Sequence, residues 1–591
     1  MSTPAAEPPV LSIEHLSVDI ETSRGTIHPV RDVSLHIGRG EMLGLVGESG
    51  SGKSVTAMTI TRLLPPRSTH VTQGRILLDG HDLVPVSERE MRTVRGKEVA
   101  MIFQEPMTAL NPVLTIADQV TEPLRRHLGM HRRAAHERAR ELLDMVGIRD
   151  TARVLGDHPF QLSGGMRQRV MIAMAMACEP RLLIADEPTT ALDVTTQLQI
   201  LDLIVELQEA HGTSVLLITH DLGVVAQTCS RVAVMYDGQL QETASVWDVF
   251  ARPQAEYTRR LLSFLPQGRR HATSDGVEPD QPATMVAEPA LAAPPQDRGT
   301  GARPLLEVRD LVKTFPGRGR AGAPVHAVRG VSFDVPRGST VAIVGESGSG
   351  KSTIGRAVLR LHEPTSGSVT FDGTDLLGLD AAGMRAMRSR MQIVFQDTYA
   401  TLDPRWTVGR LLAEPLRLHT DLTTSQVQDR VVEVLDLVGL DADHAQRFPH
   451  EFSGGQRQRV GIARALLLNP DLVVCDEPVS ALDVSIQAQV LDLMKDLQAR
   501  LGLTYLFISH DLSVVESMAA RIVVMSNGRV VEQGPTEQVL HRPQHPYTRA
   551  LLAAVPVVDP AERASREQRR EVVARGLMAA DDVADEGGQA A

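Results

Sequence analysis

The chain has 591 residues, of which 42% are hydrophobic and 23% charged, and its formal net charge is −12. This composition is ordinary for a globular protein of several domains, and the acidic balance excludes a global basic surface for nucleic acid. No apolar run approaches the roughly 18 residues needed to cross a bilayer, and the first ten residues lack the regions of a signal peptide. We therefore expect a cytosolic protein whose membrane contacts go through partners.

The predicted elements begin with short alternating strands over residues 10–45. GEMLGLVG then predicts a strand that runs into GESGSGKS (47–54) and a helix, and a further apolar strand is expected within 99–106. From about 115 to 165, apolar residues recur at helical spacing between charges, which predicts an inserted helical subdomain. RLLIADE, a helix over about 196–210 and SVLLITH then complete a parallel α/β layer.

A Pro-, Ala- and Gly-rich stretch separates two halves of similar plan. It has few large apolar side chains and cannot bury a core, so it predicts a linker. Each half closes on a similar element, RPQAEYTRRLLSFLP (252–266) and RPQHPYTRALLAAVP (542–556), and a charged, Ala-rich tail is expected to be flexible. We therefore expect a first domain, a linker, a second domain and a flexible tail, at 1–266, 267–303, 304–557 and 558–591.

The stretch from Leu162 to Val194 recurs without a gap from Phe452 to Val484. Corresponding residues lie 290 positions apart, from the SGG glycines through the Asp-Glu pair to the histidine beyond. A long gapless duplication indicates two copies of one machine in a single chain.

GESGSGKS occurs once in each half and matches the phosphate-loop pattern G-x-x-x-x-G-K-[ST]. Its glycines let backbone N–H groups curve round phosphates at the start of a helix. The lysine is expected to reach the terminal phosphates and the final serine to contact Mg²⁺. The alternative, a tight turn that matches the pattern by chance, is disfavoured because the motif occurs at the same place in both halves. The expected phosphate-binding residues are Gly47, Ser49, Gly50, Gly52, Lys53 and Ser54, and Gly345, Ser347, Gly348, Gly350, Lys351 and Ser352.

LLIADE and LVVCDE are apolar strands that end in two adjacent carboxylates. Successive strand residues point to opposite faces, so the two acids can do different work. Asp186 and Asp476 suit a water-mediated hold on Mg²⁺. Glu187 and Glu477 suit positioning or deprotonating an attacking water.

His220 and His510 each follow an apolar strand and precede Asp-Leu. A lone histidine in this place is usually structural, but two at a fixed distance from the acid pair favour a hydrogen bond to the γ-phosphate or the attacking water. LSGG and FSGG each precede a helix and offer another N-terminal anion site, to which Ser163 or Ser453 adds a hydroxyl. By residue content alone, each could be only a capped helix.

In both halves the phosphate loop, an FQE or FQD glutamine, the SGG signature, the Asp-Glu strand, an ALD turn and the strand-end histidine follow in that order. This order resembles the ABC transporter ATPases over both halves. The resemblance implies an α/β fold with two tandem P-loop NTPase domains, each a RecA-like parallel-sheet core with an antiparallel β subdomain and a helical subdomain. It also implies head-to-tail pairing, in which each signature faces the nucleotide of the other half.

The resemblance implies two composite ATP sites, with Asp193 and Asp483 at the junction between the halves. Gln104 and Gln396 would sense Mg²⁺, which Ser54 with Asp186 and Ser352 with Asp476 would help to hold. One site would combine Lys53, Ser54, Gln104, Asp186, Glu187 and His220 with Ser453, Gly454, Gly455 and Gln456. The other would combine Lys351, Ser352, Gln396, Asp476, Glu477 and His510 with Ser163, Gly164 and Gly165.

Three features depart from the family pattern or distinguish the halves. The first signature has Met166 where the second has Gln456. Phe315 is expected to stack on adenine, but its counterpart in the first half is Ile20. Some related ATPases carry a cysteine cluster after the YTR element. Neither extension here contains cysteine, so we expect no iron–sulfur cluster.

The YTR elements, with IFQEPMTALNP and FQDTYATLDPR, resemble the peptide/nickel importer branch, and the fused length resembles its glutathione and di-/oligopeptide importer ATPases. This implies ATP and Mg²⁺ as ligands, two membrane permeases and an extracytoplasmic solute-binding protein as partners, and a place on the cytoplasmic face of the membrane. A nickel- or opine-type importer of the same branch is the alternative. A double-ABC translation factor is disfavoured by the Pro/Ala-rich linker, a DNA-repair ATPase by the absence of long insertions, and an exporter by the YTR elements.

Overall fold

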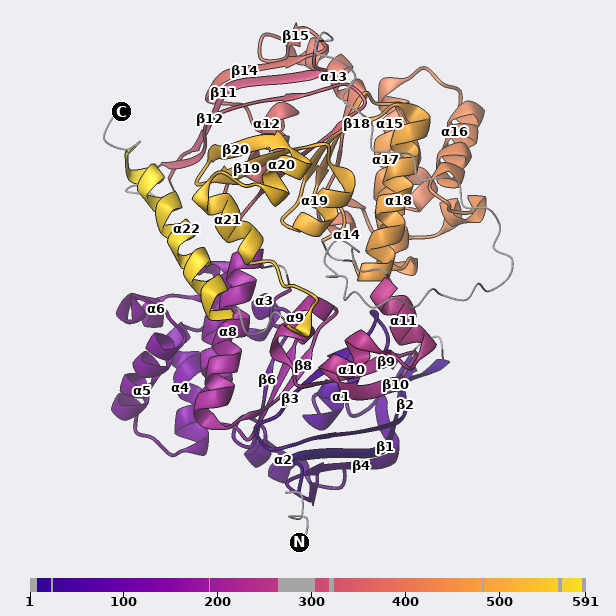
Figure 1. Ribbon diagram of the computed structural model, residues 1–591. Coiled ribbons are helices and arrows are strands. Elements are labelled where there is room, and N and C mark those ends of the chain that lie inside the picture. The colour runs from indigo at the N-terminus through magenta and orange to yellow at the C-terminus, as the bar shows by residue number, and fades with distance from the viewer. Residues whose placement is uncertain are drawn as a thin grey trace, which may run out of the picture.

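The computed structural model describes residues 8–22, 25–190, 192–263, 303–317, 324–480, 482–561 and 566–586. These form two halves of the same architecture, one above the other in Figure 1. Almost all of the predicted linker lies outside the described residues. Among the helices described, none combines the length and the apolar composition that a membrane span requires.

Each half contains a four-stranded antiparallel sheet built round its first strand. In the first half the strand order is β2-β1-β4-β5, and β1 pairs antiparallel with both β2 and β4. The second half repeats it as β12-β11-β14-β15. These strands are β1 (Leu11–Thr22), β2 (Gly25–Ile37), β4 (Thr69–Leu78), β5 (His81–Asp82), β11 (Leu306–Phe315), β12 (Val325–Val335), β14 (Ser366–Phe371) and β15 (Thr374–Asp375).

The core of each half is a six-stranded sheet. Five of its strands are parallel, and the edge strand that comes last in the chain, β10 or β20, runs antiparallel to its neighbour. The order is β10-β9-β3-β8-β7-β6 in the first half and β20-β19-β13-β18-β17-β16 in the second. Its central strands are buried along their whole length, which is why they read as continuous apolar runs. The strands are β3 (Met42–Val46), β6 (Val99–Ile102), β7 (Leu182–Asp186), β8 (Ser214–Ile218), β9 (Arg231–Tyr236), β10 (Gln239–Ser245), β13 (Thr340–Gly345), β16 (Met391–Val394), β17 (Leu472–Asp476), β18 (Thr504–Ile508), β19 (Arg521–Ser526) and β20 (Arg529–Pro535).

The helices of the first half divide between the core sheet and the predicted helical subdomain. The subdomain comprises α3 to α7, and its amphipathic helices pack α4 against α5 and both against α7. The helices are α1 (Lys53–Ile60), α2 (Glu88–Val94), α3 (Pro106–Ala109), α4 (Ile116–His127), α5 (Arg132–Met145), α6 (Thr151–Gly156), α7 (Gly164–Met176), α8 (Val194–His211), α9 (Leu222–Thr228), α10 (Val246–Ala251) and α11 (Glu256–Ser263).

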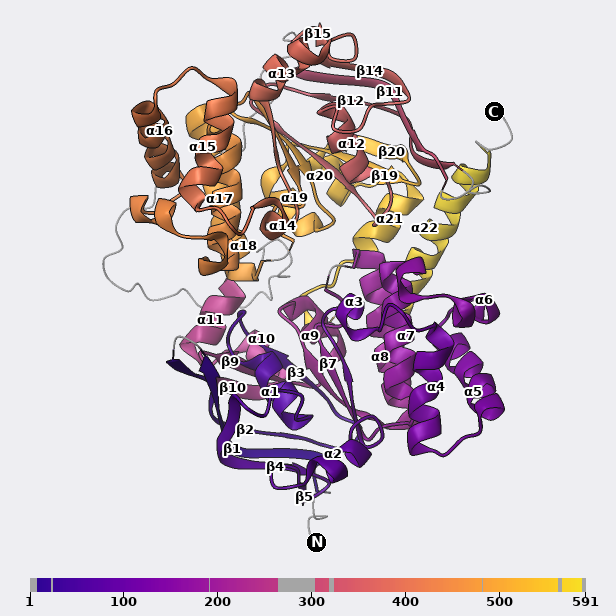
Figure 2. The ribbon, with the colours of Figure 1, turned by 180° about the vertical axis from the view of Figure 1, so that it is seen from behind.

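The second half repeats this set, with α14 to α17 as its helical subdomain, except that a 3-10 helix, Ala442–Gln446, stands where the first half has α6. Seen from behind in Figure 2, the two helical subdomains lie at diagonally opposite sides of the molecule. The helices are α12 (Lys351–Val358), α13 (Ala381–Arg390), α14 (Thr398–Thr401), α15 (Val408–His419), α16 (Thr424–Leu437), α17 (Gly454–Leu466), α18 (Val484–Leu501), α19 (Leu512–Met518), α20 (Thr536–His541) and α21 (Pro546–Ala553). The α/β fold of two tandem domains is thus confirmed.

The C-terminal residues differ from the prediction of a flexible tail. They form helix α22 (Arg566–Glu586), which packs along α21 and reaches the first half beside α8 (Figure 1). Arg570 Nε lies 2.6 Å from Asp202 Oδ2 of α8 and its Nη1 lies 2.7 Å from Glu206 Oε1. Val573 is buried in a cluster that includes Val194 of the first half. The tail was expected to be flexible because its own sequence offers few partners. Its apolar and ionic partners lie in distant parts of the chain and reach it only after folding.

Candidate nucleotide sites

Each phosphate loop leaves the end of a central strand and enters a helix at its lysine. Gly47 has φ 156°, and a Cβ there would lie 2.1 Å from the Met235 carbonyl oxygen, so the tight approach requires glycine. Lys53 Nζ donates to the carbonyl oxygens of Gly47 and Glu48, both at 2.8 Å. Lys351 repeats this in the second half. The ammonium therefore lies over its own loop, beside the N–H groups at the start of the helix, where an anion is favoured.

The last loop serine and the first acid of each pair meet in both halves. Ser54 Oγ donates to Asp186 Oδ1 at 3.0 Å, and Ser352 Oγ donates to Asp476 Oδ1 at 2.6 Å. Burial raises the pKa of Asp186 to about 6 and raises that of Asp476 as well. A hydroxyl and one carboxylate beside a phosphate loop fit Mg²⁺, which usually takes one or two carboxylates together with substrate phosphates.

Glu187 occupies the left-handed region of the backbone, with φ 46°. Such a conformation is strained for a side chain of this size and is typical of functional sites. Gln104 Nε2 donates to Glu187 Oε2 at 2.7 Å, and His220 Nδ1 lies 3.3 Å from Oε1. Burial acts to raise the pKa of Glu187, but the hydrogen bond and charge of His220 outweigh it and lower the pKa to about 2.

Glu477 has the same surroundings in the second half, with φ 49°. Gln396 Nε2 donates to Glu477 Oε2 at 2.8 Å, and His510 Nδ1 lies 3.2 Å from the same oxygen. Here too burial acts to raise the pKa of the glutamate, and the bond to His510 outweighs it and lowers the pKa. For both histidines burial acts to lower the pKa, but the glutamate partner raises it. Each half therefore places an ionised glutamate against a histidine that favours its charged form.

The two halves contact each other at the phosphate loops. Ser49 N donates to Asp483 Oδ1 at 2.9 Å, and Ser347 N donates to Asp193 Oδ2 at 3.4 Å. A cavity of about 220 Å³ opens at the second loop; it is lined by Leu192, Asp193, Ala327, Ser347, Gly348, Gly350, Lys351, Ser352, Thr353, Gln396, Glu477 and His510. Residues of both halves thus surround the Lys351 loop.

The signature residues begin α7 and α17 and cap those helices. Ser163 Oγ accepts from Met166 N at 3.3 Å, whereas Ser453 accepts from Gln456 N and also donates its own N–H to Gln456 Oε1 at 3.1 Å. The methionine cannot return that second bond. Within the described residues, the cavity at Lys351 is lined from the first half by Leu192 and Asp193 rather than by Ser163. The expectation that each signature faces a nucleotide stays a prediction.

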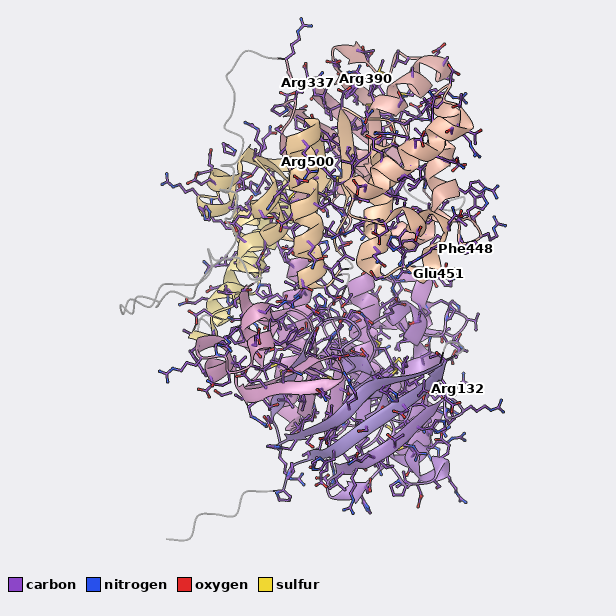
Figure 3. All side chains as sticks on the ribbon, turned by 90° about the vertical axis from the view of Figure 1, so that its right-hand side faces the viewer. Arg132, Arg337, Arg390, Phe448, Glu451 and Arg500 are labelled. Atoms are coloured by element: carbon purple, nitrogen blue, oxygen red, sulfur yellow. The ribbon has the colours of Figure 1, made fainter. Side chains whose placement is uncertain are left out.

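The approach to the second signature lies near the first half. The turn Pro449–Glu451 precedes it, and Glu451 Oε2 accepts from Phe448 N at 2.9 Å. Figure 3 labels Phe448 and Glu451 at the end of the second half nearest the first. This places the start of the signature helix α17 on the side where the halves meet.

Phe315 does not line the cavity at Lys351. Its ring faces Lys313 Nζ, 4.9 Å from the ring centroid, and the edge of His362, with centroids 5.5 Å apart. Ile20 of the first half lies in β1. Adenine stacking on Phe315 and the absence of an iron–sulfur cluster both stay predictions.

The sequence reasoning missed one pair of residues at these sites. Tyr257 Oη accepts from Glu48 N at 3.3 Å, and Tyr547 Oη accepts from Glu346 N at 3.1 Å. Both tyrosines belong to the YTR elements, to which the sequence assigned no role. Their spacing of 290 residues, the same as that of the acid pairs, was the available signal.

Comparisons with known proteins agree with this geometry. The family model "ABC transporter" matches residues 30–190 and 328–480, and "Oligopeptide/dipeptide transporter, C-terminal region" matches 531–578. The glutathione import ATP-binding protein GsiA of Pectobacterium atrosepticum is 49% identical over 578 residues, covering 95% of this chain and 92% of the relative. Its counterpart in Escherichia coli K12 is 49% identical over 573 residues, covering 95% and 91%. The chain therefore belongs to the ABC transporter family, as a fused pair of ATP-hydrolysing domains of the peptide importer branch.

Proposed function

We propose that this chain is the ATP-hydrolysing subunit of an importer for glutathione or other small peptides. Relatives of nearly the same length, 49% identical, are named glutathione import ATP-binding proteins, and the C-terminal match to the oligopeptide/dipeptide transporter region supports the same solute class. The chain would act at the cytoplasmic face of the membrane, bound to two permeases that receive the solute from an extracytoplasmic binding protein.

The phosphates of ATP bind the two glycine loops. The N–H groups at the starts of α1 and α12, which no side chain caps, would supply positive charge to the phosphates together with Lys53 and Lys351. Mg²⁺ would be held by Ser54, Gln104 and Asp186, and by their counterparts Ser352, Gln396 and Asp476; when bound, it neutralises charge on the phosphate oxygens.

Glu187 and Glu477 orient the attacking water and accept its proton. Hydrogen bonds from Gln104 and Gln396 and the contacts with His220 and His510 fix each carboxylate in its ionised form. The histidines add positive charge at the γ-phosphate. Because phosphoryl transfer depends on positioning and electrostatics more than on covalent chemistry, this set suffices for hydrolysis.

Reciprocal contacts between the halves support the proposal that each ATP site is built from residues of both halves. Asp193 of the first half meets the second phosphate loop, and Asp483 of the second half meets the first. That exchange supports head-to-tail pairing. ATP would draw Ser453, Gly455 and Gln456 toward the Lys53 loop, and Ser163 and Gly165 toward the Lys351 loop. Hydrolysis would then let the halves separate.

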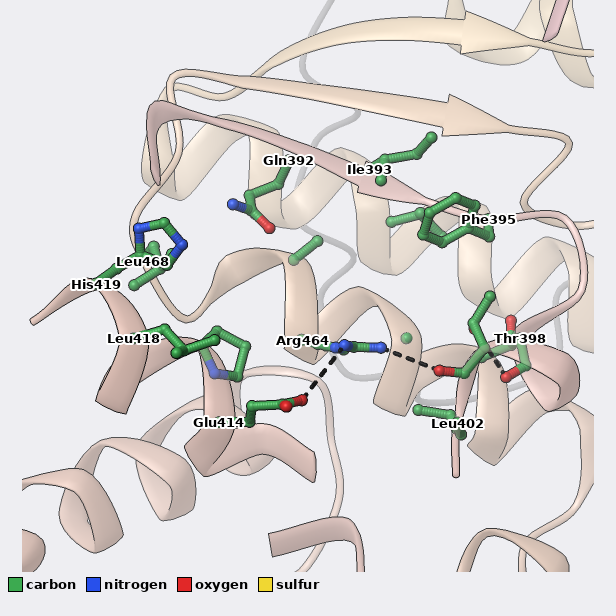
Figure 4. A pocket seen from close by; sticks show the side chains of 15 residues that line it. Gln392, Ile393, Phe395, Thr398, Leu402, Glu414, Leu418, His419, Arg464 and Leu468 are labelled. Carbon is green, nitrogen blue, oxygen red and sulfur yellow. Dashed lines mark hydrogen bonds and ion pairs between the residues drawn. The ribbon is translucent and has the colours of Figure 1, made fainter. Parts of the chain in front are cut away.

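A groove of about 280 Å³ in the second half suits a short helix of a permease (Figure 4). It lies between β16 and the helical subdomain, with Phe395, Leu402 and Leu418 as apolar lining. Arg464 crosses it to Glu414 at 3.8 Å and donates to the Thr401 carbonyl oxygen at 3.1 Å. Gln396, which donates a hydrogen bond to Glu477, follows Phe395 directly in the chain. A helix bound in the groove could therefore shift Gln396 and, through it, the catalytic glutamate.

Reconstitution tests the proposal. The chain would be co-expressed with two permease subunits of a peptide importer, placed in proteoliposomes and supplied with a solute-binding protein. We expect glutathione or a short peptide on the binding protein to stimulate ATP hydrolysis and solute uptake. Stimulation by a nickel complex, with no response to glutathione or to di- and oligopeptides, would contradict the solute class. Failure to bind ATP would contradict the whole proposal.

A further inference from the structure

The helix that closes each half touches the phosphate loop of that half through a tyrosine. Tyr257 in α11 and Tyr547 in α21 accept hydrogen bonds from the second residue of the loop, Glu48 N and Glu346 N. The paired residues are 209 and 201 positions apart in the chain. The contact is therefore made only by the tertiary fold, and it occurs in both copies.

Tyr547 has a closely packed environment. Its side chain is 1% exposed and belongs to a cluster with Val573 of α22 and Val194 of the first half. Its hydroxyl also has a side-chain hydrogen bond with Ser526. In addition, α22 lies so close that a Cβ on Gly576 would be 2.7 Å from the Pro546 carbonyl oxygen. The phenol is consequently fixed from several sides.

Tyr257 is held differently, because Tyr236 occupies the position that corresponds to Ser526. The rings of Tyr236 and Tyr257 lie 4.3 Å apart between centroids, and Tyr257 is half-buried. Burial raises the pKa of Tyr257 to about 12 and raises the pKa of Tyr547 as well. Both hydroxyls thus keep their proton at neutral pH.

The residue that Tyr547 holds is also reached from the other half. The Thr195 hydroxyl of the first half lies 2.5 Å from Glu346 Oε1. Glu346 follows Gly345, whose φ of 148° and close approach to the Met525 carbonyl oxygen fix the start of the loop. The next peptide groups, up to Lys351, are those proposed above to bind phosphate. Fixing Glu346 N therefore restricts the conformations of the binding loop before any ligand arrives.

We propose that Tyr257 and Tyr547 are positioning residues for ATP: each phenolic oxygen holds the second N–H of its phosphate loop and so sets the affinity of that loop for MgATP. Tyr547 is not among the residues that line the cavity at the Lys351 loop, so its assigned role is to hold the loop and not to contact the nucleotide or the reacting atoms. A loop held in its binding shape loses less conformational freedom on binding, which raises affinity. The proposal rests on the ATP sites proposed above.

Tyr547→Phe and Tyr257→Phe test it in the full-length chain. Tyr547→Phe is measured with Lys53→Ala, and Tyr257→Phe with Lys351→Ala, so that one loop at a time binds MgATP in equilibrium titrations. Loss of one hydrogen bond to a preorganised loop predicts affinity lower by about three- to tenfold for MgATP and for MgADP. In the otherwise wild-type chain, KM rises by a similar factor while kcat changes by less than about twofold, because no catalytic contact is lost.

Tyr505→Phe is the matched control. Tyr505 is also buried and its hydroxyl donates to the Met494 carbonyl oxygen at 3.1 Å, away from the loop, so its loss should leave MgATP affinity unchanged. If Tyr547→Phe or Tyr257→Phe binds as its parent does, or if Tyr505→Phe weakens binding equally, the proposal is wrong. If Tyr547→Phe does not fold, Tyr257→Phe decides alone. A parent that binds no ATP would refute the proposed ATP sites, whereas a binding parent with unaltered Phe variants refutes only the tyrosine role.

Discussion

The two junction aspartates occupy equivalent positions but are held differently. Asp193 caps α8 by accepting from Thr196 N at 3.0 Å and lies 3.4 Å from Ser347 N. Asp483 makes no such cap for α18 and accepts from Ser49 N at 2.9 Å instead. Burial acts to raise both pKa values, but the hydrogen bonds from Thr196 and Thr195 outweigh it at Asp193 and lower that pKa, whereas the pKa of Asp483 is raised. A duplicated sequence therefore does not produce two identical junctions.

Helix α8 explains part of the difference, because it carries several contacts to the second half. Asp193 and Thr195 meet the second phosphate loop at its start, and Asp202 and Glu206 bind Arg570 of α22 further along. The halves are thus tied together beside the Lys351 loop by contacts that follow one helix. We therefore expect the two sites to differ in nucleotide affinity and in turnover.

Replacing the glutamates should have the largest effect. Glu187→Gln with Glu477→Gln should retain ATP, hold the halves together and lower turnover by more than about a hundredfold, because the general base is lost. Phosphate release and retained nucleotide measure this, and rapid hydrolysis by the double variant would contradict the assignment. Between the single variants we expect the larger loss of turnover from Glu477→Gln. Glu477 belongs to the site at the Lys351 loop, which two residues of the other half contact, Asp193 and Thr195. Equal losses would show that the asymmetry has no catalytic effect.

Reversing one charge in α22 should weaken the tie between the halves. Arg570→Glu places like charges beside Asp202, which is 11% exposed, and should lower the apparent midpoint of thermal unfolding by about 2–4 °C. Adding Asp202→Arg should recover part of this loss, as a double-mutant cycle would measure. Arg575→Glu is the control, because the partner of Arg575 is Glu571 within the same helix. An equal shift in the control would mean that only the helix itself was weakened.

Removing the threonine contact should affect one site alone. Thr195→Val removes the hydroxyl that meets Glu346 and should lower MgATP affinity at the Lys351 loop by about two- to fivefold. Affinity at the Lys53 loop should not change. Ser485→Ala, at the corresponding position of α18, provides the comparison. The interpretation fails if both variants alter both loops alike.

Exchanging the signature residues should have the smallest effect. Met166→Gln allows the reciprocal cap that Gln456 makes in α17 and should stabilise α7 by about 0.5–1 kcal/mol. Gln456→Met should destabilise α17 by a similar amount. Thermal unfolding measures both, and ATPase activity should stay within about twofold. A hundredfold rise in activity for Met166→Gln would mean that the first signature is defective and that the chain has one working site.

Residues that act through local backbone geometry were predictable from the sequence. The glycines, lysine and serine of each phosphate loop are close in the chain, and the Asp-Glu pair and the histidine mark the ends of adjacent apolar strands. The sequence pattern assigned Ser54 and Asp186 to the same Mg²⁺, and Glu187 and His220 to the same reaction centre. The structure brings each pair together, because parallel strands place their carboxyl ends at one edge of a sheet.

Residues that act through distant packing were not predictable. The tyrosines of the YTR elements were visible, but their contact with a loop about two hundred positions away depends on how α11 and α21 pack. The tail gave a similar result. Its many alanines and the Glu571–Arg575 pair favour a helix, but α8, which it binds, lies in the other half. Charge and composition thus predict that the tail forms a helix, but they do not predict which surface the helix packs against.

The contact between α22 and α8 also bears on the order in which the chain is made. Asp202 leaves the ribosome 368 residues before its partner Arg570. Domains generally fold from the N-terminus as synthesis proceeds, so α8 waits with this face uncovered while the second half is translated. Asp202 and Glu206 keep their part of this face polar during that interval, and a water-facing carboxylate does not promote aggregation as an apolar patch would. Docking of α22 then covers these carboxylates with Arg570.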